Sequence, residues 1–275
     1  MSDLFDLTDQ VAIVTGGAGM LGIQHASAIA RAGGRPVIAD LSLEAVERSA
    51  LEISDAHNIE SMGVQVDVTS KAQVDTMVDA VLARFGRIDI LINNAALTVK
   101  GGGIQSRDYF APFETYPQDL WEKALQVNLT GAFLCCQAVG KHMVDRRSGV
   151  VLNIASDVGT ISPDHRIYEG AINPGTGEPF NTPIAYATTK AGLINFTRYL
   201  ATYWAPHGIR VNCLSPGGVY AGHDAIFLKN VAERIPLGRM ARANEYQGAV
   251  LFLVSAASSY MTGANLIVDG GRTAW

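Results

Sequence analysis

Short runs of apolar residues alternate along this chain with longer amphipathic stretches, and this alternation restricts the fold more than any other feature. Each run is apolar almost throughout and is bounded by turn residues, as expected for a strand buried on both faces. The predicted strands cover residues 11–16, 36–40, 61–68, 88–95, 149–156, 209–217 and 265–271. The predicted helices cover residues 20–33, 43–57, 71–86, 117–146, 185–205 and 243–256. The pattern predicts an α/β fold: a seven-stranded, doubly wound parallel sheet with helices on both faces.

The whole chain, residues 1–275, is expected to form one domain. Its 275 residues suffice for one large α/β domain, and no linker, internal repeat or low-complexity tract divides them. Two segments, 97–114 and 162–184, are longer than the usual connections of a compact domain. We expect both to be insertions at the edge of the sheet where the strands end.

Composition and charge exclude several classes of function. The net charge is −5 and the basic residues form no run, which argues against a nucleic-acid partner. No stretch approaches the roughly 20 apolar residues of a membrane span, and the polar start of the chain lacks the order of a signal peptide. The 3 cysteines cannot make a disulfide framework. We therefore expect a cytoplasmic protein without a membrane partner.

The stretch TGGAGMLG, residues 15–22, lies between the first predicted strand and the first predicted helix. Glycines at such a junction permit a tight turn and let a pyrophosphate approach the N–H groups of the helix. The stretch contains G-x-G-x-x-G when read from Gly17 and T-G-x-x-G-x-x-G when read from Thr15. Plain strand–helix turns show similar spacings, so the glycines alone are weak evidence for a dinucleotide site.

Asp40 strengthens the prediction of a dinucleotide site. It ends the second predicted strand, 18 residues after Gly22. A carboxylate at this position accepts hydrogen bonds from the hydroxyls of the adenosine ribose and repels a 2′-phosphate. Leu41 and Ser42 follow, without a basic residue that would bind such a phosphate. The predicted cofactor is therefore NAD rather than NADP.

The motif YATTK places Tyr186 and Lys190 four residues apart near the start of a predicted helix, so both project from one face. A phenol has a pKa of about 10, which is too high for ready proton transfer at neutral pH. A lysine ammonium and a positive nicotinamide ring beside the phenol would lower that pKa. Taken alone, however, the motif is usually a surface pair on a helix.

The chain resembles the short-chain dehydrogenase/reductases over essentially its whole length. The resemblance rests on an ordered set of motifs: TGGAGMLG, the acid Asp40, VDV with Asp67, NNAA at 93–96, QVNLTGAF with Asn128, LNIAS ending at Ser156, YATTK, SPGGVY at 215–220 and VDGG at 268–271. The glycine loop has the spacing of the family's extended subtype. The length and the later motifs match the compact single-domain subtype.

The resemblance implies four catalytic residues. Tyr186 would act as the general acid/base on the substrate oxygen, while Lys190 would bind the nicotinamide ribose and lower the pKa of Tyr186. Ser156 would hydrogen-bond the substrate oxygen, and Asn128 would support a proton relay through water to Lys190. Ser156 or Asn128 taken singly would more often form a local backbone hydrogen bond, but the full set favours catalysis.

The resemblance also implies which residues surround the dinucleotide. They are Gly16, Gly19, Met20, Leu21, Asp40, Leu41, Asp67, Val68, Asn94, Ala95, Tyr186, Lys190, Pro216, Gly217 and Val219. Met20 stands where the compact subtype has a glycine. We expect Gly19 to supply the conformational freedom, while Met20 presents its backbone to the pyrophosphate and its side chain to the pocket or to helix packing.

The largest departure from the family is the 162–184 segment, which lengthens the interval between Ser156 and Tyr186. Because it leaves and returns beside both residues, we expect it to wall the substrate pocket. The alternative is a surface loop or a subunit contact. The candidate substrate contacts on this segment are His165, Arg166 and Tyr168.

Other segments near the same edge offer further substrate contacts. Lys100 and Arg107, on the 97–114 insertion, would suit a polar or anionic substrate. The region after Pro216 resembles the family's mobile substrate lid. Its candidate contacts are Tyr220, His223 and Phe227. No cluster of histidine and cysteine at ligand spacing predicts a metal site.

The predicted function is the NAD-dependent interconversion of a secondary alcohol and a ketone on a small polar substrate, such as a sugar, a polyol or a sugar derivative. One alternative is reduction of a 3-ketoacyl group on a carrier, which Asp40 and the polar 162–184 segment disfavour. Another is a non-catalytic dinucleotide-binding sensor, which the intact Asn, Ser, Tyr and Lys set disfavours. The family resemblance also implies a homo-oligomer, a tetramer or a dimer, formed partly through the helices at 117–146 and 185–205 and through the C-terminal segment.

Overall fold

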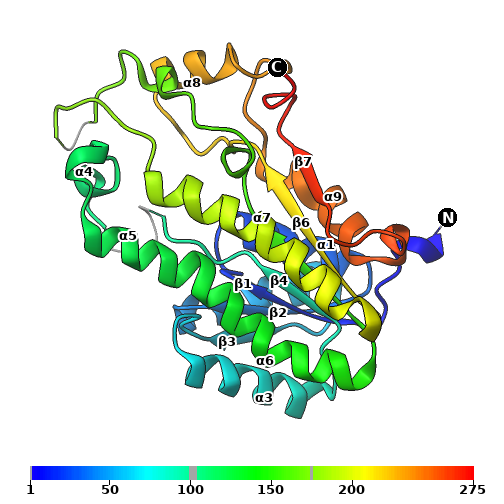
Figure 1. The fold of residues 1–275 in the computed structure, drawn as a ribbon. Helices are drawn as coiled ribbons and strands as arrows, with labels where there is room; N and C mark the ends of the chain where they lie inside the picture. Colours follow the sequence, from blue (N-terminus) through cyan, green and yellow to red (C-terminus); the bar gives the residue numbers. More distant parts are fainter. Residues whose placement is uncertain (1, 99–103, 174–175) are drawn as a thin grey trace.

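The computed structural model describes residues 2–98, 104–173 and 176–275 (Figure 1). Within these residues, seven strands form one parallel sheet in the order β3-β2-β1-β4-β5-β6-β7. This order confirms the predicted doubly wound α/β fold. The strands are β1 (Val11–Thr15), β2 (Arg35–Asp40), β3 (Met62–Gln65), β4 (Ile90–Asn93), β5 (Gly149–Ile154), β6 (Ile209–Pro216) and β7 (Asn265–Val268).

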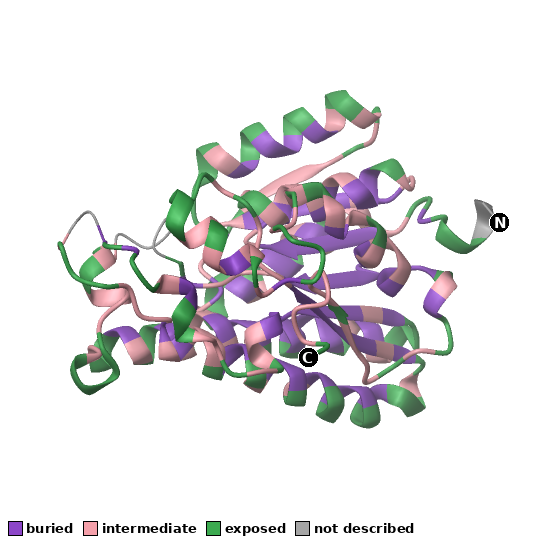
Figure 2. Cartoon of the chain, turned by 90° about the horizontal axis from the view of Figure 1, so that it is seen from above, coloured by how far each residue is buried: buried purple, intermediate pink, exposed green. Residues whose placement is uncertain are grey.

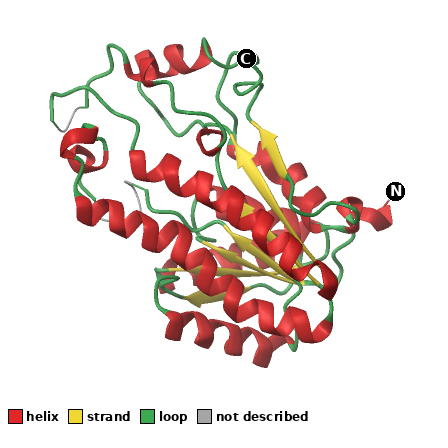
Figure 3. Ribbon diagram, in the orientation of Figure 1, coloured by secondary structure: helices red, strands yellow, loops and turns green. Residues whose placement is uncertain are grey.

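Helices cover both faces of the sheet, and their apolar sides form two separate cores with it (Figure 3). One layer contains α3 (Lys71–Phe85), α5 (Gln118–Leu125), α6 (Gly131–Arg146) and α7 (Ile184–Trp204). The other contains α1 (Met20–Arg31), α2 (Leu43–His57) and α9 (Gln247–Val254). Seen from above, the buried strands lie between helices whose outward faces are exposed (Figure 2).

The carboxyl ends of the strands carry the long connections. β1 pairs with β2 on one side and with β4 on the other, so the connections that follow β1 and β4 diverge and open a crevice. Two short helices, α4 (Ser106–Tyr109) and α8 (Ala225–Ala232), lie beyond the same edge (Figure 1). This edge is where the sequence places the cofactor and the substrate.

Local interactions explain several helix boundaries. The hydroxyl of Ser42 accepts a hydrogen bond from the backbone N–H of Ala45 and caps α2, and that of Ser70 caps α3 in the same way. Gly86 ends α3 as predicted, because its φ of 71° suits glycine. In the described chain, no helix is long and apolar enough to cross a membrane.

Some boundaries differ from those expected. The helix expected over 117–146 is interrupted by a π-helical turn, Gln126–Thr130. β3 ends before Asp67, whose carboxylate accepts a hydrogen bond from the N–H of Thr69 and so starts a turn. β7 ends at Val268, shortly before Gly270 and Gly271, whose positive φ values of 69° and 90° are incompatible with a strand. The helix α8 was not predicted; its residues fall in the region assigned to the lid.

His25 is a fully buried titratable residue in α1. Neither of its ring nitrogens has a hydrogen-bond partner among the described residues, and burial lowers its pKa to about 4. A neutral imidazole is therefore tolerated in this core, whereas a protonated one is not.

We predict that His25 limits acid stability. Between pH 6.5 and pH 4 the unfolded chain binds the proton more readily than the folded chain, so stability is present above this window and is lost as the pH falls. From pH 7 to pH 4.5 the free energy of unfolding should fall by about 2 to 3 kcal/mol because of His25 alone. Urea denaturation at both pH values should show a smaller loss for His25→Leu, which has a similar volume. An equal loss in both proteins would show that other groups cause the acid sensitivity.

Candidate active site

Tyr186 and Lys190 lie on the first two turns of α7, which faces the end of β5. The ammonium of Lys190 is buried and donates a hydrogen bond to the carbonyl of Ile154, at 2.7 Å. It lies 5.5 Å from the centroid of the Tyr186 ring. The structure thus brings together the phenol and the ammonium that the sequence paired.

Ser156 follows β5 and completes this group. It is buried, has an extended backbone with a φ of −166°, and its hydroxyl lies close enough to the Tyr186 phenol to lower the pKa of that phenol. A hydroxyl and a phenol this close together form a site where one substrate oxygen can contact both groups. The candidate catalytic residues Ser156, Tyr186 and Lys190 therefore lie together.

Burial dominates the protonation of this group. It raises the pKa of Tyr186 to about 12, against the opposing effect of the Ser156 hydroxyl and together with the carboxylate of Asp157. It also lowers the pKa of Lys190 to about 8. The expectation that Lys190, together with the positive nicotinamide ring, lowers the pKa of Tyr186 stays a prediction for the protein with cofactor bound.

Asn128 lies in the π-helical turn between α5 and α6. It is buried, its side-chain oxygen accepts a hydrogen bond from the N–H of Leu97 at 2.8 Å, and its amide donates to the hydroxyl of Thr189 at 2.9 Å. π turns occur often at functional sites, because the extra residue redirects a side chain. Asn128 connects the segment after β4 to the residue that precedes Lys190.

The glycine loop after β1 is shaped by close backbone contacts. Gly16 has a φ of 60°, which favours glycine. A Cβ at Gly17 would lie 2.6 Å from the carbonyl of Val14, and one at Gly22 would lie 2.2 Å from the carbonyl of Gly16. Gly19 has φ −75° and ψ 170°, a conformation open to any residue. The expectation that Gly19 supplies the conformational freedom is therefore wrong, because Gly16 adopts the left-handed conformation.

Met20 is the first residue of α1 and keeps 49% of its surface exposed. Its side chain is therefore not committed to helix packing, one of the two expected places. The N-cap residue Gly19 has no side chain that could cap α1, and the first turn of α1 contains no acidic residue. The free N–H groups of this turn, which includes Leu21, suit a phosphate.

Asp40 lies beside this loop. One carboxylate oxygen accepts a hydrogen bond from the N–H of Ala18 at 3.1 Å, and the other from the N–H of Leu41 at 2.8 Å. Its partly exposed carboxylate is thus fixed within reach of the crevice, next to the exposed side chain of Leu41. The loop and the acid together fit the pyrophosphate and the ribose of a dinucleotide.

Four of the expected cofactor contacts also form hydrogen bonds or packing contacts within the protein. Asn94 donates hydrogen bonds to the carbonyls of Thr15 and Gly16, both at 3.0 Å, and the N–H of Ala95 bonds the hydroxyl of Thr15. The remaining two follow β3, where Asp67 starts its turn and the buried Val68 packs against Gly131. They lie at the carboxyl ends of β4 and β3, the edge that borders the crevice.

Three further expected contacts lie at the end of β6 or shortly after it. Pro216 is the last residue of that strand, and the N–H of Gly217 bonds the carbonyl of Val268 at 2.9 Å. A Cβ at Gly217 would lie 2.8 Å from the Cα of Asp269, so this position requires glycine. Val219 pairs with Ala241 in an isolated bridge.

Comparison with known proteins agrees with this geometry. The family model for short chain dehydrogenases matches residues 10–169, and a second, described as enoyl-(acyl carrier protein) reductase, matches residues 175–273. The chain is 35% identical to a D-threitol dehydrogenase of Mycolicibacterium smegmatis over 98% of its own length and 95% of that protein. The chain belongs to the short-chain dehydrogenase/reductase family.

Solved structures of this family superpose on the whole chain. A gluconate 5-dehydrogenase from Burkholderia cenocepacia, in complex with NADP and tartrate, is 32% identical and gives a TM-score of 0.86, covering 100% of this chain and 99% of that one. An NAD+-bound xylitol dehydrogenase is 30% identical and gives a TM-score of 0.83, covering 96% and 99%. This chain is therefore an oxidoreductase of a family whose relatives bind either dinucleotide.

The first part of the 162–184 segment, residues 164–169, packs against α8 and the residues that follow it. Arg234, just after α8, pairs with Asp164 at 2.7 Å, and Tyr168 stacks on Phe227 with ring centroids 5.3 Å apart. His165 and Arg166 are exposed, and Arg166 also pairs with Asp164. Contact of His165, Arg166 and Tyr168 with substrate stays a prediction.

The other candidate substrate contacts are mostly at the surface. Arg107 is exposed, and Lys100 falls outside the described residues. Tyr220 and His223 are exposed as well, with ring centroids 6.4 Å apart. Within the described part of the chain, no group of three or more acidic, histidine or cysteine side chains could hold a metal ion.

Sequence reasoning missed three residues near the catalytic group. Tyr109 of α4 lies close enough to Tyr186 for the two phenols to interact electrostatically, and burial raises its pKa. Asp157 bonds Ser156 and pairs with Arg272, which follows β7. The place of Asp157 next to Ser156 was visible in the sequence, whereas nothing in the sequence connects it to Arg272.

We predict different effects of two loop substitutions on NADH binding. Met20→Gly should keep binding within a few-fold, because the Met20 side chain is half exposed and its backbone contacts remain. Gly22→Ala should abolish binding, because its Cβ would overlap the carbonyl of Gly16. Fluorescence titration of NADH measures both, with circular dichroism as the control for folding. Loss of binding in a folded Met20→Gly protein would contradict this account of the loop.

Proposed function

We propose that this protein is an NAD-dependent oxidoreductase that interconverts a secondary alcohol and a ketone on a small polyhydroxylated substrate. The observation that carries the proposal is the grouping of the buried Ser156 and Tyr186 side chains, with the Lys190 ammonium 5.5 Å from the phenol ring. These groups lie at the same edge of the sheet as the glycine loop and Asp40.

The residues of the site divide the chemistry between them. The glycine loop and Asp40 would hold NAD+, which would supply the hydride acceptor for the carbinol carbon, so that the alcohol would give a ketone, NADH and one proton. Tyr186 would take that proton from the substrate hydroxyl. The Ser156 hydroxyl, which donates to Asp157 in the protein alone, would turn its hydrogen to the substrate oxygen when substrate binds. Lys190 would bind the nicotinamide ribose and favour the phenolate once the positive ring lies nearby. The Asn128 side chain already bonds Leu97 and Thr189, so a water relay from Lys190 would use its backbone carbonyl.

Asp40 supports the choice of NAD. Its carboxylate is held between Ala18 and Leu41, and neither neighbour offers a positive charge to a 2′-phosphate. The similar proteins named above act on threitol, gluconate or xylitol by their names, and all three compounds carry several hydroxyl groups. These names support a polyol or a sugar derivative as the substrate.

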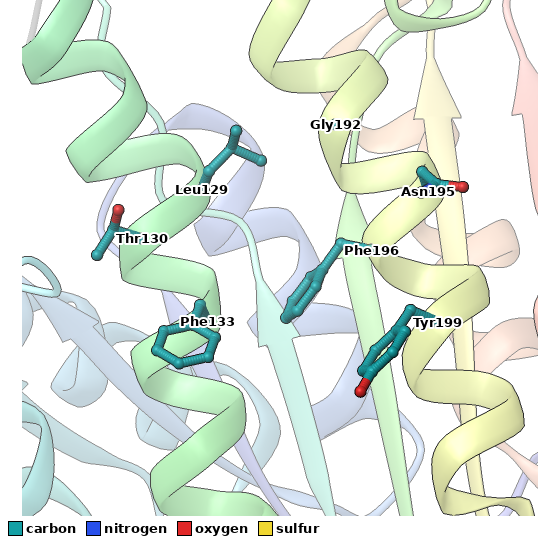
Figure 4. A pocket seen from close by; sticks show the side chains of 7 residues that line it. All are labelled: Leu129, Thr130, Phe133, Gly192, Asn195, Phe196 and Tyr199. Carbon is teal, nitrogen blue, oxygen red and sulfur yellow. The ribbon is translucent and has the colours of Figure 1, made fainter.

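We further propose a homo-oligomer that forms through α6 and α7. A hollow of about 470 Å³ lies between these helices and is lined by Leu129, Thr130, Phe133, Gly192, Asn195, Phe196 and Tyr199 (Figure 4). Phe133 is 47% exposed and Tyr199 is 63% exposed. Large aromatic side chains that remain exposed on neighbouring helices are typical of an association surface. The cytoplasmic location stays a prediction from the sequence.

The first test is turnover. We expect oxidation of one or more polyols with NAD+, at a kcat/KM well above that with NADP+, and loss of turnover by at least about a thousandfold in Tyr186→Phe, which lacks the acid/base group. Absorbance at 340 nm measures the reaction over a panel of polyols, sugar acids and a 3-ketoacyl thioester. NADH binding without turnover of any compound would favour a sensor, and preference for the thioester would favour a ketoacyl reductase.

The second test is the oligomeric state. The variant with both Phe133→Glu and Tyr199→Glu should sediment as a smaller species than the unmodified protein, because buried carboxylates would oppose association. Leu51→Glu is a control, since Leu51 is exposed on α2, in the other helix layer. An unchanged sedimentation coefficient in the double variant would rule out this surface.

A further inference from the structure

The hydroxyl of Ser156 has a second neighbour besides Tyr186. It lies 2.9 Å from a carboxylate oxygen of Asp157, which is buried and also accepts a hydrogen bond from the N–H of Val158. A carboxylate oxygen can only accept, so Ser156 donates its single hydrogen in this contact. The orientation of the Ser156 hydroxyl is therefore set by Asp157.

The charge of Asp157 is balanced from a distant part of the chain. Its other oxygen accepts a hydrogen bond from Arg272 Nη1 at 2.7 Å, across 115 residues of sequence. The side chains of Asp157 and Arg272 are only 3% and 11% exposed. A buried carboxylate needs such a partner, because an uncompensated charge in the interior is strongly destabilising. The segment after β7 is thereby joined to the residue that follows Ser156.

The carboxylate also acts on the phenol. Its negative charge favours the neutral form of Tyr186 and thus raises the pKa of that group. Arg272 offsets this effect, since a positive charge on the same carboxylate weakens its field. The other ionisable groups that face Tyr186 or Asp157 are Lys190 from α7, Tyr109 from α4 and Tyr246, which precedes α9.

We propose that Asp157 and Arg272 form a positioning pair for the reaction: Asp157 holds the Ser156 oxygen beside Tyr186 until the substrate oxygen accepts the hydroxyl hydrogen, and Arg272 holds the Asp157 carboxylate in place and balances its charge. This inference rests on the proposed dehydrogenase function. It assigns a role to the C-terminal segment, which supplies Arg272 to the site without touching the reacting atoms.

The test is the pH dependence of kcat/KM for alcohol oxidation with NAD+. Asp157→Asn should move the midpoint of the acid limb to lower pH by about one unit, and Arg272→Met should move it to higher pH by a similar amount. The double variant, which leaves no buried charge unpaired, should return close to the unmodified midpoint. A nearby negative charge raises the pKa of both Tyr186 and Lys190, and a nearby positive charge lowers both. The expected directions of the shift are therefore the same whichever of the two groups controls the acid limb of the profile.

Two controls separate this role from a structural one. Arg272→Lys keeps the charge, so its midpoint should stay near that of the unmodified protein. The absorbance of tyrosinate can also be titrated with pH, and subtraction of the same titration of the matching Tyr186→Phe protein isolates the signal of Tyr186. This titration, which needs no turnover, should show a lower pKa of Tyr186 in Asp157→Asn. Midpoints that do not move, or that move in the same direction in both single variants, would overturn the pairing. Absence of turnover in the unmodified protein would instead refute the proposed function, while the absorbance titration would still test the pair.

Discussion

The buried ammonium of Lys190 is the constraint on which the site depends. A charge without water must be bonded, and Ile154 at the end of β5 supplies the carbonyl. This bond holds the start of α7 against the sheet, one helical turn from Tyr186 and two residues from Ser156. The same turn of α7 meets Asn128 through Thr189. A single buried charge thus fixes the relative positions of residues from three elements that the chain brings together from far apart.

The two helix layers and the parallel sheet were accessible from the sequence, because each depends on a short-range pattern, whereas the catalytic group was expected from the family resemblance. Apolar runs predict buried strands wherever both faces are covered, and the spacing of Tyr186 and Lys190 places both side chains on one helix face. The position of the glycine loop was predicted correctly, but the glycine that adopts the left-handed conformation was not. The left-handed residue is Gly16, and a spacing of glycines does not say which one adopts a positive φ.

What the sequence could not predict depends on contacts between distant residues. The pairing of Asp157 with Arg272 spans 115 positions, and neither residue type is unusual at its place. The raised pKa of Tyr186 follows from the loss of water around the phenol, which only packing determines. The π turn at Asn128 likewise reads as ordinary helix, since the extra residue leaves the apolar periodicity almost intact.

The 97–114 and 162–184 insertions contact each other, and the 162–184 insertion also contacts α8. Asn181 donates a hydrogen bond to the carbonyl of Phe110, and the rings of Phe110 and Phe180 meet edge to face with centroids 4.9 Å apart. Asn230 of α8 donates to the carbonyl of Glu169 at 2.8 Å. A chimera that received only one of these segments from a relative would lose partners on both sides. Exchange of substrate preference between relatives would therefore require all three segments to be transplanted as a unit, which also limits how independently they can diverge.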